Sequence, residues 1–198
     1  MDRGRPRSFD ADAALDRALD VFWRDGFQGA ALSTLTRAMG INKPSLYAAY
    51  GDKASLYLKA LQRYARKESA RHVQALEREP DGRKAVESFL RSTVRSLTDP
   101  KKPGGCFVVT GTADCGLDDT PAEVQEALRQ ALRGGELALR QRLQRAQADG
   151  HLPTDVDVAA LAAYFGTVMS GLGVQAKAGA SRAKLESIVR AAMLAWPQ

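Results

Sequence analysis

Few side chains in this sequence have the types and spacing that catalysis or metal binding requires. The two histidines, His72 and His151, lie far apart, and neither has a cysteine or an acidic cluster at the spacing of a metal site. The sequence also lacks a phosphate-binding glycine loop, a dinucleotide fingerprint and a nucleophile elbow. We therefore expect no metal, no cofactor and no enzymatic activity.

Cys106 is the residue best suited to covalent chemistry. It lies in GGCFVVTGTADCGLDD, a short apolar run between glycines that we interpret as a short buried helix beside a cavity. On an ideal helix Cys106 and Cys115 would be about 13 Å apart and on opposite faces, too far for a disulfide. A free thiol at Cys106 could sense an oxidant or an electrophile, or serve a thiol-dependent enzyme. The alternative is a small apolar side chain that only fills space.

A second group of candidate residues lies in the segment LTRAMGINKPSLYAAYGDK, residues 35–53. Gly40 stands where the chain must reverse, Pro44 suits the first turn of a new helix, and Gly51 stops that helix. Leu46 and Tyr50, four residues apart, share the face that we expect to be buried. The spacing predicts two short helices joined by a tight turn, the pattern of a DNA-binding helix-turn-helix.

The second of these helices starts with side chains that can read bases. Lys43 can donate to guanine, Asn42 can pair with adenine, and Ala48 can contact a thymine methyl group. Ser45 lies on the same turn and can also reach a base edge. We expect this helix to lie in a DNA major groove.

The sequence at this point resembles a known family. GINKPSLYAAYGDKASL is similar to the DNA-binding signature of TetR-type transcriptional regulators, and FDADAALDRALDVFWRDGF is similar to the first helix of that family. The resemblance covers about the first sixty residues. It implies that Tyr47 binds phosphate through its hydroxyl and Lys53 through its charge. From the residues alone, Tyr47 could instead pack in the small core.

One part of the head departs from the family pattern. This chain has Ala30-Ala31 where the family has the serine or threonine that caps the second helix and touches phosphate. We expect Ser33 or Thr34 to move the cap forward and shorten that helix, and we place Thr34 among the DNA-binding residues. The fold should survive, since such a cap is worth only about 1 kcal/mol.

The N-terminal arm is basic. Arg3, Arg5 and Arg7 alternate with Gly4 and Pro6, a spacing similar to that of an AT-hook. Such an arm can lie in a narrow minor groove, and the alternative is a solvated tail that aids solubility. A net charge of +6 and a pI near 9.5 favour a polyanionic partner.

The rest of the chain shows helical periodicity over residues 10–25, 52–79, 83–98, 121–147, 155–177 and 181–196. We predict an all-α fold, with a three-helix DNA-binding domain at 1–53 and a larger helical ligand-binding and dimerisation domain at 54–198. The helix over 52–79, roughly 28 residues and about 40 Å long, would connect the two. A Gly134-Gly135 pair would be the place for a kink in the helix over 121–147.

Two sets of residues follow for the second domain. The candidates for the ligand pocket are Phe89, Cys106, Phe107 and Phe165. The C-terminal helices have more apolar surface than one core can cover, which suggests a two-fold four-helix interface as in the resembled family. The candidates for that interface are Val168, Met169, Leu172, Ile188 and Val189.

These features favour a homodimeric, ligand-responsive transcriptional regulator. We expect a repressor that a small-molecule or electrophile inducer releases from a palindromic operator in double-stranded DNA. No apolar run approaches the roughly twenty residues that span a bilayer and no secretory signal is seen, so we expect a cytoplasmic, nucleoid-associated protein without a membrane partner. The alternatives are a nucleoid-type architectural protein and a thiol-dependent enzyme that uses Cys106.

Overall fold

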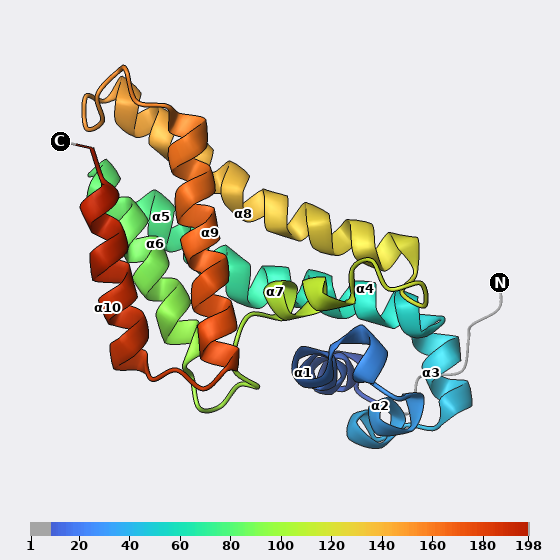
Figure 1. Cartoon of the computed structure of the whole chain (residues 1–198). Helices are drawn as coiled ribbons and strands as arrows, with labels where there is room; N and C mark the ends of the chain where they lie inside the picture. The colour runs from blue at the N-terminus through green and yellow to red at the C-terminus, as the bar shows by residue number, and fades with distance from the viewer. Residues whose placement is uncertain (1–8, 198) are drawn as a thin grey trace.

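The computed structural model describes residues 9–197, and the elements of this part of the chain are helical. The predicted all-α fold is thus confirmed. A head of three helices lies at one end of the molecule, and a group of longer helices lies at the other (Figure 1). The helices are α1 (Ala11–Gly29), α2 (Leu32–Met39), α3 (Lys43–Tyr50), α4 (Lys53–Tyr64), α5 (Ala70–Arg78), α6 (Gly82–Leu97), α7 (Phe107–Gly111), α8 (Ala122–Ala148), α9 (Val158–Lys177) and α10 (Arg182–Ala192). The arm residues Arg3, Arg5 and Arg7 lie outside the described residues.

Local signals set the limits of the head helices. Asp10 caps α1, its Oδ1 accepting from the backbone N–H groups of Asp12 at 2.9 Å and Ala13 at 3.1 Å. Asp52 caps α4 in the same way through Ser55. Gly40 ends α2 at φ 69°, the left-handed conformation that a side chain rarely adopts. These three boundaries are where the residue types predict them.

The start of α2 differs from the prediction. The helix begins at Leu32, and its N-cap residue Ala31 makes no side-chain capping bond, so Ser33 and Thr34 lie inside the helix. The expected forward shift of the cap is therefore wrong. The reason is tertiary: Leu35 is fully buried, and packing of this face outweighs the roughly 1 kcal/mol that a cap contributes.

The connection between head and body is the predicted long helix with one interruption. Between α4 and α5 the chain forms a π-helical turn, Ala65–Ser69, without leaving the helical path. A π-turn accommodates an extra residue in an α-helix and is often found at functional sites. Glu68 in this turn is buried, where its Oε2 accepts from Ser96 Oγ at 2.7 Å and Lys102 Nζ at 2.6 Å.

Two apolar cores support the molecule. The first includes Phe22 and Phe27 of α1, which meet Tyr57 of α4 edge-on at centroid distances of 4.9 and 5.4 Å. This core continues into α7 and α8, which lie beyond the domain boundary predicted between Lys53 and Ala54. The core therefore does not separate the two predicted domains, and that boundary remains a prediction. The second core lies among α6, α8, α9 and α10, which are close together in Figure 1.

The helix α8 runs from the second group of helices to the region above the head (Figure 1). It is a single helix from Ala122 to Ala148 that continues through Gly134 and Gly135, and the kink predicted at these two glycines stays a prediction. We call the run α4–π-turn–α5 the lever helix, and the group α6 to α10 the body. Since α8 contacts α4, α5, α6, α7 and α9, it holds the lever helix and the body together.

Candidate DNA-binding surface and ligand cavity

The helix α3 is held firmly on its inner side. Leu46 and Tyr50 are buried, as predicted, and the Tyr50 hydroxyl donates to the carbonyl of Ala11 at 2.7 Å. Arg17 of α1 donates to the carbonyl of Met39 at the end of α2 at 3.1 Å. These bonds hold α2 and α3 against α1, so the outer face of α3 is presented on a rigid support.

The outer face of α3 carries the predicted base-reading residues. Lys43 and Ala48 are exposed, and Ser45 is half-buried. Asn42 is also exposed, but its Oδ1 caps α3 by accepting from the backbone N–H of Ser45 at 2.8 Å. Only the amide N–H₂ of Asn42 is therefore uncommitted, whereas paired recognition of adenine uses both amide atoms.

The residues predicted to bind phosphate differ in their surroundings. Tyr47 is 42% exposed, so it does not pack in the small core, and Lys43 Nζ lies 5.7 Å from its ring centroid. Lys53 Nζ lies 4.6 Å from the ring centroid of Phe27, and partial burial lowers the pKa of Lys53. Thr34 is half-buried in the first turns of α2.

Ion pairs join α1 of the head to α4. Arg63 donates through Nε and Nη2 to the two carboxylate oxygens of Asp16, both at 2.8 Å, and it also pairs with Asp12. Lys67 in the π-turn reaches Asp16 Oδ1 at 2.6 Å. The hydrogen bond from Arg63 is the main reason that the pKa of Asp16 falls to about 2. These ion pairs fasten α1 of the head to α4 and to the π-turn.

The C-terminal end of α1 is also tied to the body. The indole of Trp23 donates to the carbonyl of Gly105 at 3.1 Å, and Lys177 of α9 donates to the carbonyl of Arg24 at 3.0 Å. Beyond the non-helical Gly26, at φ 72°, the backbone N–H of Phe27 donates to Asp114 Oδ2 at 2.7 Å. Displacements of α9 or of the segment before α7 would therefore reach α1 directly.

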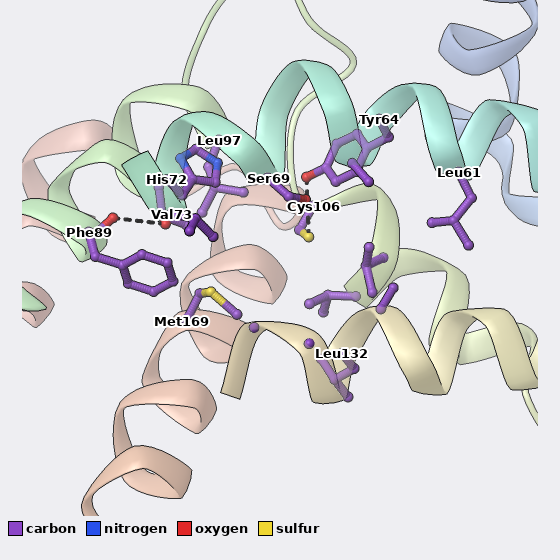
Figure 2. A pocket seen from close by; sticks show the side chains of 17 residues that line it. Leu61, Tyr64, Ser69, His72, Val73, Phe89, Leu97, Cys106, Leu132 and Met169 are labelled. Carbon is purple, nitrogen blue, oxygen red and sulfur yellow. Dashed lines mark hydrogen bonds between the residues drawn. The ribbon is translucent and has the colours of Figure 1, made fainter. Parts of the chain in front are cut away.

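A cavity of about 290 Å³ lies between the lever helix and the body. Its wall comes from α4, the π-turn, α5, α6, α7, α8 and α9, and it is almost entirely apolar. Figure 2 shows His72, Phe89 and Met169 toward one end, Leu61 toward the other, and Tyr64 beside Cys106 between them. Ala65 and Ser69 of the π-turn also line it. The volume is at the lower end of the range for small-molecule sites.

Tyr64 and His72, two of the polar residues that line the cavity, are neutral at pH 7. The Tyr64 hydroxyl donates to Cys106 Sγ at 3.4 Å, and burial raises the pKa of Tyr64 well above its usual value. His72 Nδ1 is 3.1 Å from Ser92 Oγ, and burial lowers the pKa of His72 to about 4. The cavity therefore offers hydrogen-bonding groups without a charge.

The structure places the four predicted pocket residues in two different surroundings. Phe89 and Cys106 line the cavity, but Phe107 is buried in the core that the head shares with α4, and Phe165 packs against Trp196 and Tyr164 in the body core. The prediction missed the contribution of the lever helix, namely Tyr64, Ser69 and His72. A tyrosine and a histidine on an otherwise apolar helix face were the available signal.

The predicted interface residues divide into three groups. Leu172 and Val189 are buried in the core of this chain, at 1% and 0% exposed, although Leu172 also borders the groove between α9 and α10. Met169 faces the cavity. Val168 and Ile188 are half-buried and line a groove between α9 and α10 together with the 56% exposed Val174.

The helix α9 has an unusual share of apolar surface. Val158–Lys177 has a mean hydropathy of 1.4 and is long and apolar enough to cross a membrane, so the expectation that no apolar run reaches that length is wrong. Leu161 and Phe165 nevertheless pack in the body core, as in a globular protein. Only 28% of this apolar stretch is buried, so much of α9 is left without a partner in the single chain.

Both cysteines are free thiols, and no cluster of three metal-ligating residues occurs within residues 9–197. Cys115 is half-buried, and burial raises the pKa of its thiol. Cys106 is the N-cap residue of α7, at the junction of Tyr64, α9 and the cavity. The short helix predicted beside the cavity is thus present, although it spans only Phe107–Gly111 before a 3₁₀ turn.

The chain has a helix-turn-helix head, a lever helix and a helical body with a cavity. This is the architecture of a transcriptional regulator whose DNA-binding head and cavity belong to the same polypeptide. Residues 14–60 match the model of bacterial regulatory proteins of the tetR family, and residues 82–192 match that of the tetracyclin repressor-like C-terminal domain. The chain belongs to the TetR family of transcriptional regulators, as the sequence resemblance implied.

Relatives extend the match to nearly the whole chain. The HTH-type transcriptional repressor ComR of Escherichia coli (strain K12) is 32% identical over 197 residues, 99% of this chain and 93% of ComR. The HTH-type transcriptional repressor BdcR of the same strain is 29% identical over 180 residues, 90% of this chain and 84% of BdcR. A cysteine mutant of the TetR-family regulator CifR, solved with 26-bp double-strand operator DNA, is 42% identical, with a TM-score of 0.92 and coverage of 98% of this chain and 100% of CifR.

Proposed function

We propose that this protein is a homodimeric repressor that a small molecule in the cavity releases from a palindromic operator. The observation that carries the proposal is the shared helix: the run α4–π-turn–α5 begins three residues after α3 and forms one wall of the cavity. A ligand that favours a different position of this helix would change the spacing of the two heads. Coupling then requires only that the ligand bind the two states with different affinity.

The relatives support the repressor role. ComR and BdcR are named repressors, and CifR is solved on operator DNA. Two copies of α3 would enter successive major grooves about 34–36 Å apart, which matches a pseudo-palindromic site. The groove between α9 and α10, with its exposed Val174, is the surface that we assign to the dimer. Such a regulator acts in the cytoplasm, where the DNA lies.

Operator binding tests this proposal through two lysines. Lys53→Ala should weaken binding to every sequence and reduce the salt slope by about 1, because the Lys53 charge binds phosphate. Lys43→Ala should change base preference, by about 1–3 kcal/mol at the guanine it reads. Both are measured by fluorescence anisotropy over a salt series, with Lys59→Ala, an exposed residue of α4, as the matched control.

Each outcome bears on one assignment. Unchanged affinity of the Lys53→Ala protein at low salt would remove Lys53 from the phosphate contacts. An equal loss on all sequences for Lys43→Ala would make Lys43 a phosphate contact instead. Footprinting of the wild-type protein should show one protected palindrome, whereas diffuse protection would favour the architectural role.

The inducer could also react with the protein. Cys106 lies at the cavity wall, so we propose that an α,β-unsaturated ketone entering the cavity adds to its sulfur. The thiol gives its proton to water as its sulfur forms a C–S bond at the β-carbon, the double-bond pair moves to the enolate, and the α-carbon then takes a proton from water. Mass spectrometry should find one adduct, and Cys106→Ser should lose both the adduct and the operator release by methyl vinyl ketone. Cys115→Ser is the control, and release that persists in Cys106→Ser contradicts the covalent route.

A further inference from the structure

We infer that the cavity takes a neutral, mostly apolar molecule with on the order of a dozen non-hydrogen atoms and one oxygen acceptor, which Tyr64 recognises. This inference rests on the proposed function, since it names the ligand class of the same cavity. Four features of the cavity carry it: charge, size, polarity and the pairing of its hydroxyl.

The first feature is the absence of charge in the wall. None of the described residues that line the cavity is an aspartate, glutamate, lysine or arginine. The nearby carboxylate of Glu68 does not line the cavity, and it is neutralised by Lys102 and bonded to Ser96. An ionic ligand would lose its hydration without gaining a counter-charge, a loss that disfavours binding strongly.

The single titratable base in the wall does not change this conclusion. His72 is 9% exposed, its Nδ1 is 3.1 Å from the Ser92 hydroxyl, and its ring meets Phe89 edge-on. The groups that face it are Glu68, Arg71, Arg95 and Lys102, but burial is the strongest effect and keeps the pKa of His72 near 4. The imidazole is therefore neutral at physiological pH and cannot balance an anion.

The second feature is size. A dry cavity of about 150 Å³ holds benzene, and the present cavity of about 290 Å³ is roughly twice as large. A substituted phenyl or a naphthyl group fits this space. Phe89, Leu97 and Met169 give the wall the apolar contacts that such a group needs.

Tyr64 provides the last two features, a polar group in the apolar wall and a hydroxyl whose hydrogen bond is weak. Its hydroxyl is in a buried side chain, 4% exposed, and its partner is the sulfur of Cys106 at 3.4 Å. A thiol sulfur is a weak acceptor, so a ligand hydroxyl, ether or carbonyl oxygen would be a better partner for the same donor. Tyr64 is thus the specificity-determining residue, and its ring is fixed by edge-on packing against Trp23 at 4.9 Å.

The test uses full-length protein and matched probes. Cinnamyl alcohol, propenylbenzene, cinnamate and cinnamylammonium share one skeleton, and the corresponding benzyl and naphthylmethyl series cover smaller and larger sizes. Binding is measured by calorimetry and by thermal shift. We expect the alcohol of at least one series to bind more than tenfold tighter than both of its ions, and several-fold tighter than its hydrocarbon.

Two variants locate the binding and identify the donor. Tyr64→Phe, which keeps the ring, should remove the preference of the alcohol over the hydrocarbon, a loss of roughly 2- to 13-fold. Gly135→Leu should abolish binding, because Gly135 lines the cavity and a Cβ built there lies 3.3 Å from the Cε of Met169, another residue of the wall. Replacing a helical glycine should also stabilise α8, so lost binding would not mean lost folding. Gln144→Leu, an exposed position on α8, is the matched control.

The outcomes separate this inference from the proposed function. Ions that bind as tightly as the alcohols, binding that survives Gly135→Leu, or no binding by any neutral probe at millimolar concentration overturns the ligand class. Neutral probes that bind the cavity without changing operator affinity leave the ligand class intact and remove the proposed coupling. Operator release by an ion, but by none of the neutral probes, would overturn the ligand class and leave the proposed coupling intact.

Discussion

At the residue scale, the most consequential polar contacts join the head to the lever helix rather than facing solvent. Asp16 on α1 accepts from both Arg63 of α4 and Lys67 of the π-turn. Asp20, one turn further along α1, has no such partner among the described bonds, and burial raises its pKa. Two carboxylates of one helix therefore have opposite effects on the dependence of stability on pH.

The folded-state pKa of Asp16 is about 2, below the value of 3.8 expected in the unfolded chain. A lowered pKa stabilises the folded state above pH 3.8, and that stabilisation is lost as the pH falls toward 2. Asp16→Asn should lower the free energy of unfolding at pH 7 by about 1 kcal/mol, discounted because the carboxylate is partly exposed. Urea titrations from pH 7 to 2 measure it.

Asp20→Asn is the control for this measurement. Because its pKa is raised in the fold, neutralising Asp20 should leave stability at pH 7 unchanged or increase it. Equal destabilisation by the two substitutions would show that the ion pair with Arg63 contributes nothing specific.

At the element scale, the π-turn between α4 and α5 gives the cavity part of its shape. Ala65 and Ser69 face the cavity, while Glu68 of the same turn is bonded to Ser96 and Lys102. A regular α-helix would set these residues at different angles. The extra residue of the π-turn is thus a local departure from α-helical geometry that shapes the cavity wall.

Deletion of Arg66, an exposed residue of the π-turn, should close the turn into an α-helix. The helices on either side keep their buried faces, so circular dichroism should show a folded, cooperative protein. The cavity wall changes, and we expect the affinity for neutral probes to fall at least tenfold by calorimetry.

Deletion of Lys59, exposed in the regular part of α4, is the contrasting variant. It rotates the start of α4 by about 100° relative to the rest of the helix and should disrupt the head. A Lys59 deletion that is as stable as the Arg66 deletion would contradict the special role of the π-turn.

At the scale of the whole molecule, α9 connects the body core, the cavity, the head and the proposed dimer surface. Phe165 packs in the core, Met169 lines the cavity, and Lys177 reaches the carbonyl of Arg24 on α1. Its outer face carries Tyr164 and Val174, which are 40% and 56% exposed. A second copy of the chain on this face would be sensitive to anything that moves α9.

Val174→Arg should convert the dimer to a monomer, because it adds a second cation to the mostly apolar groove between α9 and α10, which Lys184 also lines. Operator affinity should then fall more than tenfold, since a monomer binds one half-site only. Sedimentation velocity and anisotropy measure the two effects. Leu117→Arg, at an equally exposed apolar position before α8, should change neither, and a dimeric Val174→Arg protein would rule out this interface.

The head could be predicted from the sequence by itself because its signals are local. The capping bonds of Asp10 and Asp52 and the positive φ of Gly40 involve atoms only a few residues apart, so residue type and spacing specify them. The buried positions of Leu46 and Tyr50 follow from helical periodicity in the same way.

The cavity and the surface proposed for the dimer depend on the tertiary structure. Phe107, Phe165, Leu172 and Val189 are apolar residues on helices with more than one apolar face, and periodicity does not say which neighbouring helix covers which face. The π-turn changes the angles at which Tyr64, Ser69 and His72 leave the lever helix, and no propensity marks it. Residue type and spacing specify hydrogen bonds between near neighbours in the chain. The space left between packed helices instead depends on contacts among residues far apart in the chain.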